Sequence, residues 1–375
     1  MLGDYGKVVT GNTPPTKDIE NYENGTYLWA SPADLGTHKL ISETKTKLSS
    51  KGFTKTRPLS KGSVLVTCIG STIGKTGMAT REMSTNQQIN SIVVNENNDN
   101  EFVYYVVQSA FPHYLSSIAV QAVPIISKSS FELLPSKRPS LQEQNKIGKF
   151  LSLLDERIST QHRLIEDLKK FKCAIVENVL NNRHSRMIRL GDIGSYIRGL
   201  TYSSNDVVEQ NGTFIMRSNN IVNGCSLDYY NDVVSVNKRI SKEQMLQNGD
   251  IIICMANGCS ALVGKSSFYD GKCPRSITVG AFCGIYRSEE PIVKWLFQTN
   301  RYRRYIWNSL QGGNGAIANL NGKDILRMSF PIPDAPVKNN CVKLLTSVDF
   351  MIENATSLCV LYTSQKEYLL RQMFI

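Results

Sequence analysis

Residues 146–180 read KIGKFLSLLDERISTQHRLIEDLKKFKCAIVENVL, and their apolar side chains recur in alternating steps of four and three. That spacing brings one stripe of a long helix into a coiled-coil seam. The predicted seam positions are Ile147, Leu151, Leu154, Ile158, Ile165 and Leu168. A shift of 194 residues repeats the pattern near the end of the chain, at Leu345, Val348, Ile352, Cys359, Tyr362 and Leu369.

The two stripes predict two long helices that pair antiparallel as a coiled coil. A lysine interrupts each stripe at the same place, Lys172 in the first and Lys366 in the second. In an antiparallel pair, the first helix carries the chain away from one globular part and the second helix brings it back. Two long helices that pack separately onto globular cores are the alternative.

The repeat extends well beyond the helices. The matching segments are LGDYG (2–6) with LGDIG (190–194), TYLWAS (26–31) with TFIMRS (213–218), IGKT (73–76) with VGKS (263–266), and AVPIISKSSFELL (122–134) with AIANLNGKDILRM (316–328). The offset between the copies drifts, so the elements repeat while the connecting loops differ in length. The sequence therefore contains two copies of one structural unit, which indicates a tandem-repeat architecture.

Each copy begins with short β-rich runs broken by Gly, Pro, Asn and Ser, and ends with the long helix. The predicted parts are a first β-rich domain at 1–140, a first coiled-coil helix at 141–186, a second β-rich domain at 187–334 and a second helix at 335–375. The fold class that we expect is α+β. Two β-rich domains form a pseudo-two-fold tandem repeat and are separated by two long antiparallel helices.

Composition narrows the range of functions. The chain of 375 residues has 43 Lys and Arg against 32 Asp and Glu, a formal charge of +11 that is spread along its length. This distribution suits a long polyanion such as DNA, although many basic proteins bind no nucleic acid. The longest uninterrupted apolar runs have the length of strands, so no membrane span is expected. Nine scattered cysteines without a CxxC pair indicate reduced thiols of a cytoplasmic protein, and the isolated histidines predict no metal site.

The catalytic motifs that we searched for are missing or mis-spaced. A phosphate-binding loop needs four residues between its first glycine and the Gly-Lys pair. Three residues lie between Gly70 and Gly74, and five lie between Gly258 and Gly264. Turns between strands are the preferred interpretation of IGKT and VGKS. The sequence also has no [DNS]PP[YF], HExxH or GxSxG segment. We expect no enzymatic activity; a methyltransferase or nuclease with an unrecognised active site, and a coiled-coil scaffold that ignores DNA, stay as alternatives.

Candidate DNA contacts come from basic and amide side chains next to repeated turns. Arginines alternate with Tyr302, Tyr305 and Trp307 in one predicted helix, a combination that can hold a sugar-phosphate backbone. The competing interpretation buries these aromatic rings and leaves the arginines in solvent. The full candidate set is Ser31, Lys75, Gln87, Arg217, Asn219, Lys265, Arg275, Arg301, Arg303 and Arg304.

Taken with the repeat, two short motifs suggest a family. The first helix starts with P-x-x-x-E-Q at residues 139–144, and the second ends with KEYLLRQMF at residues 366–374. Over essentially its whole length the chain resembles the specificity subunit of a type I restriction-modification enzyme. It departs from that pattern in starting almost at LGD, so that a little of the first domain's edge is expected to be absent. It departs again in opening the second helix with PVKNN.

The resemblance implies a function that no single motif carries. It implies two target-recognition domains, each reading one half of a split sequence in double-stranded DNA, and helices that space the domains and dock two modification (methyltransferase) subunits. Restriction and translocase subunits would join in the full complex, and no membrane is involved. The resemblance also implies no cofactor of the chain's own, since S-adenosylmethionine, ATP and Mg would be used by the partner subunits.

Overall fold

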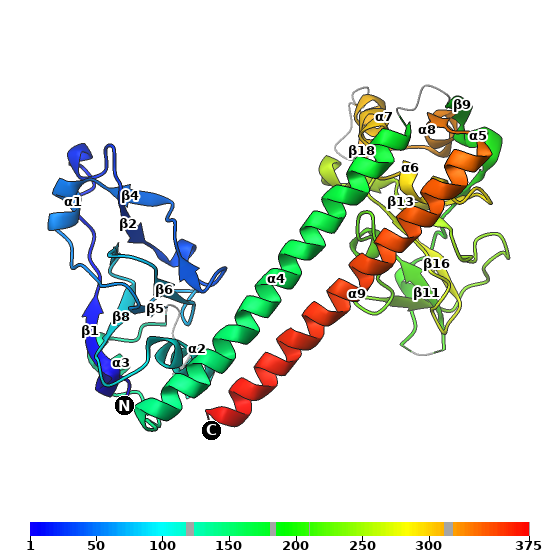
Figure 1. Cartoon of the computed structure of the whole chain (residues 1–375). Helices are drawn as coiled ribbons and strands as arrows, with labels where there is room; N and C mark the ends of the chain where they lie inside the picture. The colour runs from blue at the N-terminus through cyan, green and yellow to red at the C-terminus, as the bar shows by residue number, and fades with distance from the viewer. Residues whose placement is uncertain (118–123, 181–184, 210, 311–317, 375) are drawn as a thin grey trace. The chain divides into compact units, whose positions relative to one another are not determined.

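The computed structural model describes residues 1–117, 124–180, 185–209, 211–310 and 318–374 (Figure 1). The chain forms two compact units, each built from segments far apart in the sequence. Unit 1 consists of residues 1–163 and 356–375, and unit 2 consists of residues 164–355. Each unit thus contains one β-rich domain and a part of both long helices.

Unit 1 contains a five-stranded sheet of order β1-β8-β5-β6-β3 and a three-stranded sheet of order β4-β2-β7. Its strands are β1 (Gly6–Thr10), β2 (Tyr27–Ala30), β3 (Leu40–Ile41), β4 (Thr46–Leu48), β5 (Val64–Thr67), β6 (Thr76–Ala79), β7 (Ser84–Thr85) and β8 (Ile89–Val94). Its helices are η1 (Leu2–Tyr5), η2 (Ile19–Asn21), η3 (Pro32–Asp34), α1 (Ser50–Thr54), α2 (Asn100–Ser117) and α3 (Lys128–Glu132). The larger sheet is antiparallel except where β3 runs parallel to β6.

Unit 2 repeats this plan. A four-stranded sheet has the order β10-β17-β13-β15, a three-stranded sheet has the order β12-β11-β16, and two-stranded pairs form from β14 with β18 and from β9 with β19. The strands are β9 (Arg186–Arg189), β10 (Ser195–Arg198), β11 (Thr213–Met216), β12 (Val234–Val236), β13 (Ile251–Cys254), β14 (Ala256–Asn257), β15 (Ser266–Phe268), β16 (Ile277–Val279), β17 (Cys283–Arg287), β18 (Ala318–Asn319) and β19 (Ser329–Ile332). The helices are α5 (Leu190–Ile193), η4 (Ser204–Asp206), η5 (Ser218–Asn220), η6 (Ser260–Leu262), α6 (Val293–Leu296), α7 (Asn300–Leu310) and α8 (Gly322–Arg327).

The central strand of each larger sheet is buried on both faces. Successive side chains of a strand point to opposite faces, and in β5 Val64 and Val66 join the core beneath α2 while Leu65 joins the core of the smaller sheet. In β13, Ile251 and Ile253 join one core and Ile252 joins the other. The continuous apolar runs in the sequence therefore mark strands between two cores.

The repeated LGD segments form matching one-turn helices. Leu2 and Leu190 are fully buried, and their backbone amides donate to the carbonyls of Leu134 and Met328, 2.9 Å away in both cases. These turns tie the start of each domain to its last short helix, and Asp4 and Asp192 lie within them.

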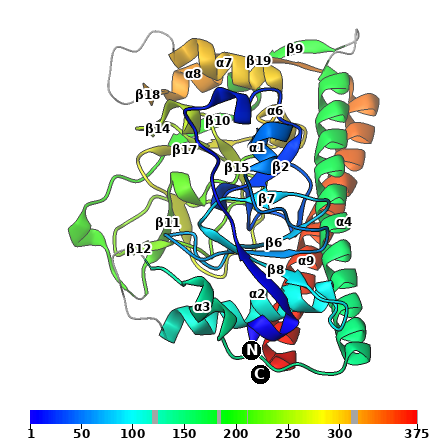
Figure 2. The same cartoon turned by 90° about the vertical axis from the view of Figure 1, so that its left-hand side faces the viewer.

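The two long helices are α4 (Leu141–Leu180) and α9 (Ala335–Met373), drawn in green and in orange to red in Figures 1 and 2. In unit 1, Leu151 and Leu154 of α4 lie in one core cluster with Leu370 of α9. In unit 2, Leu168 of α4 clusters with Val348 and Ile352 of α9. The early part of one helix thus meets the late part of the other in each unit, which is antiparallel pairing. The seam positions expected from the sequence are all buried or half-buried.

The buried Gln144 explains the first helix-start motif. Its side-chain amide donates to Asn98 Oδ1 at 3.1 Å and to the Pro139 carbonyl at 3.0 Å, and its Oε1 accepts from the Asp99 backbone at 3.1 Å. In unit 2 the equivalent position is Lys338, whose Nζ lies 2.8 Å from Glu290 Oε2. The start of α4 is therefore held by an amide to the segment before α2. The start of the second long helix is held by an ion pair to the segment before α6.

Two helix boundaries differ from the sequence expectation. The first helix, expected at 141–186, ends at Leu180; residues 181–184 lie outside the described residues, and Arg186 already belongs to β9. The second helix ends at Met373. The first residues of the repeated segments at 122 and 316 also lie outside the described part.

One of the long helices has a hydropathy that bears on the expectation of no membrane span. Helix α9 contains an 18-residue window with a mean hydropathy of 1.3, long and apolar enough to cross a membrane by length and composition. A third of that window is buried by packing, and a core helix that never meets a membrane passes the same test. Short polar interruptions hid this property when only uninterrupted apolar runs were considered.

Candidate nucleic-acid interface

In each unit, two parallel strands end side by side, and each is followed by a loop. In unit 1, β2 runs parallel to β7, with Trp29 opposite Ser84 and Ala30 opposite Thr85. In unit 2, β11 runs parallel to β16, with Met216 opposite Val279. Because parallel strands end at the same edge of a sheet, the loops that follow them meet there. We call this the recognition edge of each unit.

The recognition edge of unit 1 carries Ser31 after β2 and Gln87 after β7. The Ser31 hydroxyl donates to Asp34 Oδ2 at 2.7 Å, which closes the turn of η3. The Thr13 hydroxyl donates to the Gln87 side-chain carbonyl. The structure thus brings two of the candidate side chains to one edge, although Ser31 uses its hydroxyl within its own turn.

The recognition edge of unit 2 carries Arg217 and Asn219 after β11. The Arg217 Nη2 donates to the Asp232 backbone carbonyl at 3.0 Å, and Asn219 donates to the Asp232 carboxylate. The Arg217 Nε atom is buried and has no hydrogen-bond partner within the described chain. Asp232 therefore orients both side chains, while the Arg217 side chain as a whole stays 40% exposed and within reach of a ligand.

Sequence reasoning missed several residues at the same edges. Asn86 donates from its side chain to Gln88 Oε1 at 3.1 Å, next to Gln87. Asn257 donates to Ser218 Oγ at 3.2 Å, and Phe282, in the loop after β16, is 67% exposed. The polar run that follows β7 in the sequence contained a signal for Asn86 and Gln88. Nothing in the local pattern around Asn257 indicated that it lies beside η5.

The two Gly-Lys turns are closed strand-to-strand connections. They join the antiparallel strands β5 and β6 in unit 1 and β13 and β15 in unit 2. The backbone amides of Gly74, Lys75, Gly264 and Lys265 all donate to nearby backbone carbonyls at 2.8–3.2 Å. A phosphate-binding loop needs such amides free. The interpretation as turns is confirmed, and a phosphate loop is excluded on hydrogen bonding as well as on spacing.

The arginines of α7 do not form one surface. Arg301 donates to the Ser329 carbonyl at 3.2 Å, while Arg303 borders a cavity of about 290 Å³ together with Lys172 and Glu177. Residues two positions apart on a helix point about 200° apart, so these two side chains lie on opposite faces. Tyr302 is buried and Arg304 is exposed, as the competing interpretation has it, but Trp307 is 67% exposed and departs from it.

The remaining basic candidates also scatter. The Arg275 guanidinium lies 5.1 Å from the centre of the Phe214 ring, ahead of β16 and so at the opposite end of the strand pair from Arg217. The aliphatic part of Lys75 packs over Gly36. Lys265 lies in the turn that α7 supports, where the Tyr302 hydroxyl donates to the Gly264 carbonyl at 2.7 Å.

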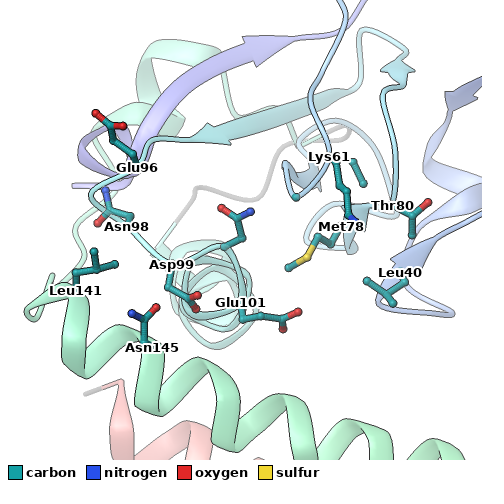
Figure 3. Close-up of a pocket in the computed structure, with 13 residues that line it drawn as sticks. Leu40, Lys61, Met78, Thr80, Glu96, Asn98, Asp99, Glu101, Leu141 and Asn145 are labelled. Carbon is teal, nitrogen blue, oxygen red and sulfur yellow. The ribbon is translucent and has the colours of Figure 1, made fainter.

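A broad hollow of about 810 Å³ lies on unit 1, away from these candidates (Figure 3). Lys61, Glu96, Asp99 and Glu101 border it beside the start of α4, and Asn145 lines it from that helix. None of the candidate DNA-binding residues lines this hollow. Its mixed charges do not favour a polyanion.

The ionisable groups offer no assembled catalytic or metal centre. Burial raises the pKa of Cys68 to about 12 and that of Cys283 to about 12, so neither thiol forms a nucleophilic thiolate near neutral pH. Within the described ranges, no three His, Cys, Asp or Glu side chains are placed to hold a metal ion. The two recognition edges present hydrogen-bonding side chains, among them the guanidinium group of Arg217.

Comparison with known proteins gives a family. Residues 1–170 match the family described as "Type I restriction modification DNA specificity domain". The chain is 28% identical over 183 residues to the specificity subunit of the type I restriction enzyme MjaIX of Methanocaldococcus jannaschii, covering 47% of this chain and 42% of that subunit. It is 32% identical over 149 residues to the EcoKI specificity subunit of Escherichia coli, covering 38% of this chain and 31% of that subunit. The chain thus spans less than half the length of these curated relatives.

A solved structure shares the fold over the full length. The S subunit of a type I restriction-modification system from M. genitalium has a TM-score of 0.62 at 15% identity, covering 100% of this chain and 95% of that chain. The chain shares that fold, and its own α+β architecture has the duplicated β-rich domains and long helices that the heptad pattern predicts. In residues 1–170 the chain carries the specificity domain of type I restriction-modification enzymes, and it is similar to the specificity subunits of such enzymes.

Proposed function

We propose that the chain is the non-catalytic DNA-recognition subunit of a type I restriction-modification complex, and that each unit reads one half of a bipartite, asymmetric target in double-stranded DNA. The observation that carries this proposal is the pair of equivalent recognition edges with different side chains. Unit 1 has Ser31 and Gln88 at the positions where unit 2 has Arg217 and Phe282. The same scaffold with different contacts is what two different half-sites require.

The chemistry of these side chains suits direct readout of bases. Arginine pairs with guanine through two hydrogen bonds, and Asn or Gln pairs with adenine in the same way. The charge of +11 supports the sequence-independent attraction to phosphates that places such groups over the bases. In DNA-binding proteins, a few residues usually contact the bases while many contact the phosphates.

Exposed apolar side chains on the long helices support docking of two modification subunits. Phe350, Met351, Val360 and Leu361 of α9 are each at least half exposed, as is Phe171 of α4. Exposed large apolar side chains of this kind are typical of protein interfaces. It also accounts for the high hydropathy of α9 without a membrane. Restriction and translocase subunits would join the assembly in the cytoplasm.

The chemistry of the complex would then lie outside this chain. S-adenosylmethionine, ATP and Mg would be bound by the partner subunits, while this chain supplies sequence and spacing. The closed Gly-Lys turns and the neutral buried thiols support a chain without an active site of its own. The alternative, a methyltransferase or nuclease with an unrecognised site, predicts turnover by the purified chain.

The test is methylome sequencing of a host that expresses the chain with its modification subunits. The expected motif is split and asymmetric, with a non-specific gap of about one helical turn of DNA or less. A continuous or perfectly palindromic motif contradicts the proposal. In parallel, the purified chain should show no methyl transfer, DNA cleavage or ATP hydrolysis, and turnover in any of these assays would favour the alternative.

A further inference from the structure

The lysines that interrupt the two heptad stripes have repeated partners. In unit 1, Lys366 Nζ of α9 lies 2.6 Å from Asp155 Oδ1 of α4. In unit 2, Lys172 Nζ of α4 lies 3.1 Å from Asp349 Oδ1 of α9. Both the lysine and the aspartate recur at the 194-residue offset of the seam. Each pair therefore links one long helix to the other, once in each unit.

Each aspartate also binds the domain of its own unit. The Tyr105 hydroxyl of α2 donates to Asp155 Oδ2 at 2.5 Å. In unit 2, the Trp295 Nε1 of α6 donates to Asp349 Oδ2 at 3.1 Å. Both aromatic residues come from the helix that follows the last strand of the large sheet. We call each set of Asp, Lys and aromatic donor a seam node.

Further cations surround both seam nodes. Lys294 Nζ lies 2.8 Å from Asp349 Oδ2 and 3.6 Å from the centre of the Phe268 ring. In unit 1, Lys39 donates to the Tyr105 hydroxyl at 2.9 Å and pairs with Glu101. Burial together with the Asp155 carboxylate raises the pKa of Tyr105, so its hydroxyl stays a donor. The two seam nodes thus share the set of Asp, Lys and aromatic donor, but they differ in how the further lysines contact that set.

Burial makes the seam nodes selective for one helix register. The side chains of Lys172 and Asp349 are only 8% and 10% exposed. A slip of one heptad along the seam would separate each lysine from its aspartate, because no acidic residue lies seven positions from either aspartate. An unpaired buried charge is strongly unfavourable. Single polar residues in otherwise apolar seams fix register in coiled coils for this reason. The apolar heptads alone tolerate such slips.

We propose that the two seam nodes are positioning elements. They fix the register of α4 against α9 and hold each recognition domain on the helix pair, and through both they set the gap length that the complex accepts between half-sites. This inference rests on the proposed function and adds to it the residues that determine spacing. An ordinary structural salt bridge would contribute to stability without selecting a gap.

The test uses the complex of the full chain with its modification subunits. Duplexes carry both half-sites of the wild-type motif at a series of gap lengths, and the rate of methylation is measured for each. The first variant removes both charges at one node, Lys172→Leu with Asp349→Leu, because apolar replacement of a whole buried pair keeps such helices folded. The second is the charge exchange Asp155→Lys with Lys366→Asp, compared with Lys366→Asp alone.

We expect the double leucine variant to stay folded but to lose about tenfold in its preference for the wild-type gap over gaps one base pair different, since pairs of this kind couple by ~1–2 kcal/mol. Lys366→Asp alone, which places a second carboxylate opposite Asp155, should lose the preference as well. The charge exchange should restore most of the preference. The half-site sequences should not change. The control is Asp167→Lys with Lys170→Asp, an exposed pair on α4 at 3.5 Å, which should leave the gap preference intact.

A folded double leucine variant with an unchanged gap preference would overturn the inference, and so would a charge exchange that rescues nothing while Lys366→Asp retains the preference. The proposed function fails in a different way. If the wild-type complex methylates no split motif, there is no gap to measure. Thermal unfolding of every variant separates loss of folding from loss of register.

Discussion

Gly264 occupies the turn between β13 and β15 with φ at +82°, and Ile306 of α7 packs directly against it. A Cβ at this position would lie 2.7 Å from two carbon atoms of Ile306, closer than side chains pack. Gly74 has the equivalent position in unit 1, with φ at +89° and Phe111 beneath it. The glycine of the Gly-Lys turn is thus required by close helix packing and by backbone conformation, with no phosphate involved.

We therefore predict that Gly264→Ala lowers the free energy of unfolding by about 2 kcal/mol or more, because left-handed backbone strain adds to overpacking. Urea denaturation measures the change. Gly258→Ala is the matched control, since a Cβ there meets no atom within 4 Å and should change stability by less than ~0.5 kcal/mol. Equal stability of the two variants would show that the turn relaxes freely.

Arg217 is the side chain on which the recognition of one half-site depends most clearly. Asp232 orients it and its side chain is 40% exposed, so Arg217→Ala should weaken binding through unit 2 by ~1–3 kcal/mol, the value of one good base contact. Methylation of targets with single base changes should show relaxed specificity in one half only. Arg275→Ala, at the other end of the same strand pair, should leave the sequence preference unchanged. Relaxation in both halves, or in neither, would contradict this assignment.

At the scale of elements, the heptad stripes predicted the long helices because coiled-coil spacing is local and repeats over many turns. Leu154 and Val348 occupy equivalent seam positions, but they do not face each other. Leu154 packs into the unit 1 core near Leu370, and Val348 packs against Leu168 in unit 2. The seam is therefore secured separately in each unit.

A double change of Leu154→Ala with Val348→Ala should weaken the seam in both units, because truncating a buried leucine costs ~2–5 kcal/mol. Each domain keeps its own β-rich core and should keep its affinity for its own half-site. Full-site binding needs both domains to engage at once, so it should fall far more than half-site binding. Fluorescence titration with full-site and half-site duplexes measures both. Leu153→Ala, a change on the exposed face of α4, is the control, and wild-type binding of the full site by the double variant would exclude the helices as the spacer.

At the scale of the whole molecule, the duplication predicted the fold because matched segments had to form matched elements. Both the order of strands in the large sheets and the split of β5 and β13 between two cores follow from it. The site was less predictable. Contacts such as Asn257 with Ser218, or Asp155 with Tyr105, join residues far apart in the sequence, and no periodicity encodes them. The helical arginines do not form one surface, because Arg301 bonds the Ser329 carbonyl and Arg303 lies on the opposite face of α7.

The central claim is that one chain carries two independent readers of DNA. The most direct measurement is the methylome of cells in which residues 1–140 are exchanged for the corresponding domain of another specificity subunit, with the modification subunits unchanged. The account predicts a motif in which one half is replaced while the other half and the gap length stay as they were. A motif that changes in both halves, or one that does not change at all, would contradict it.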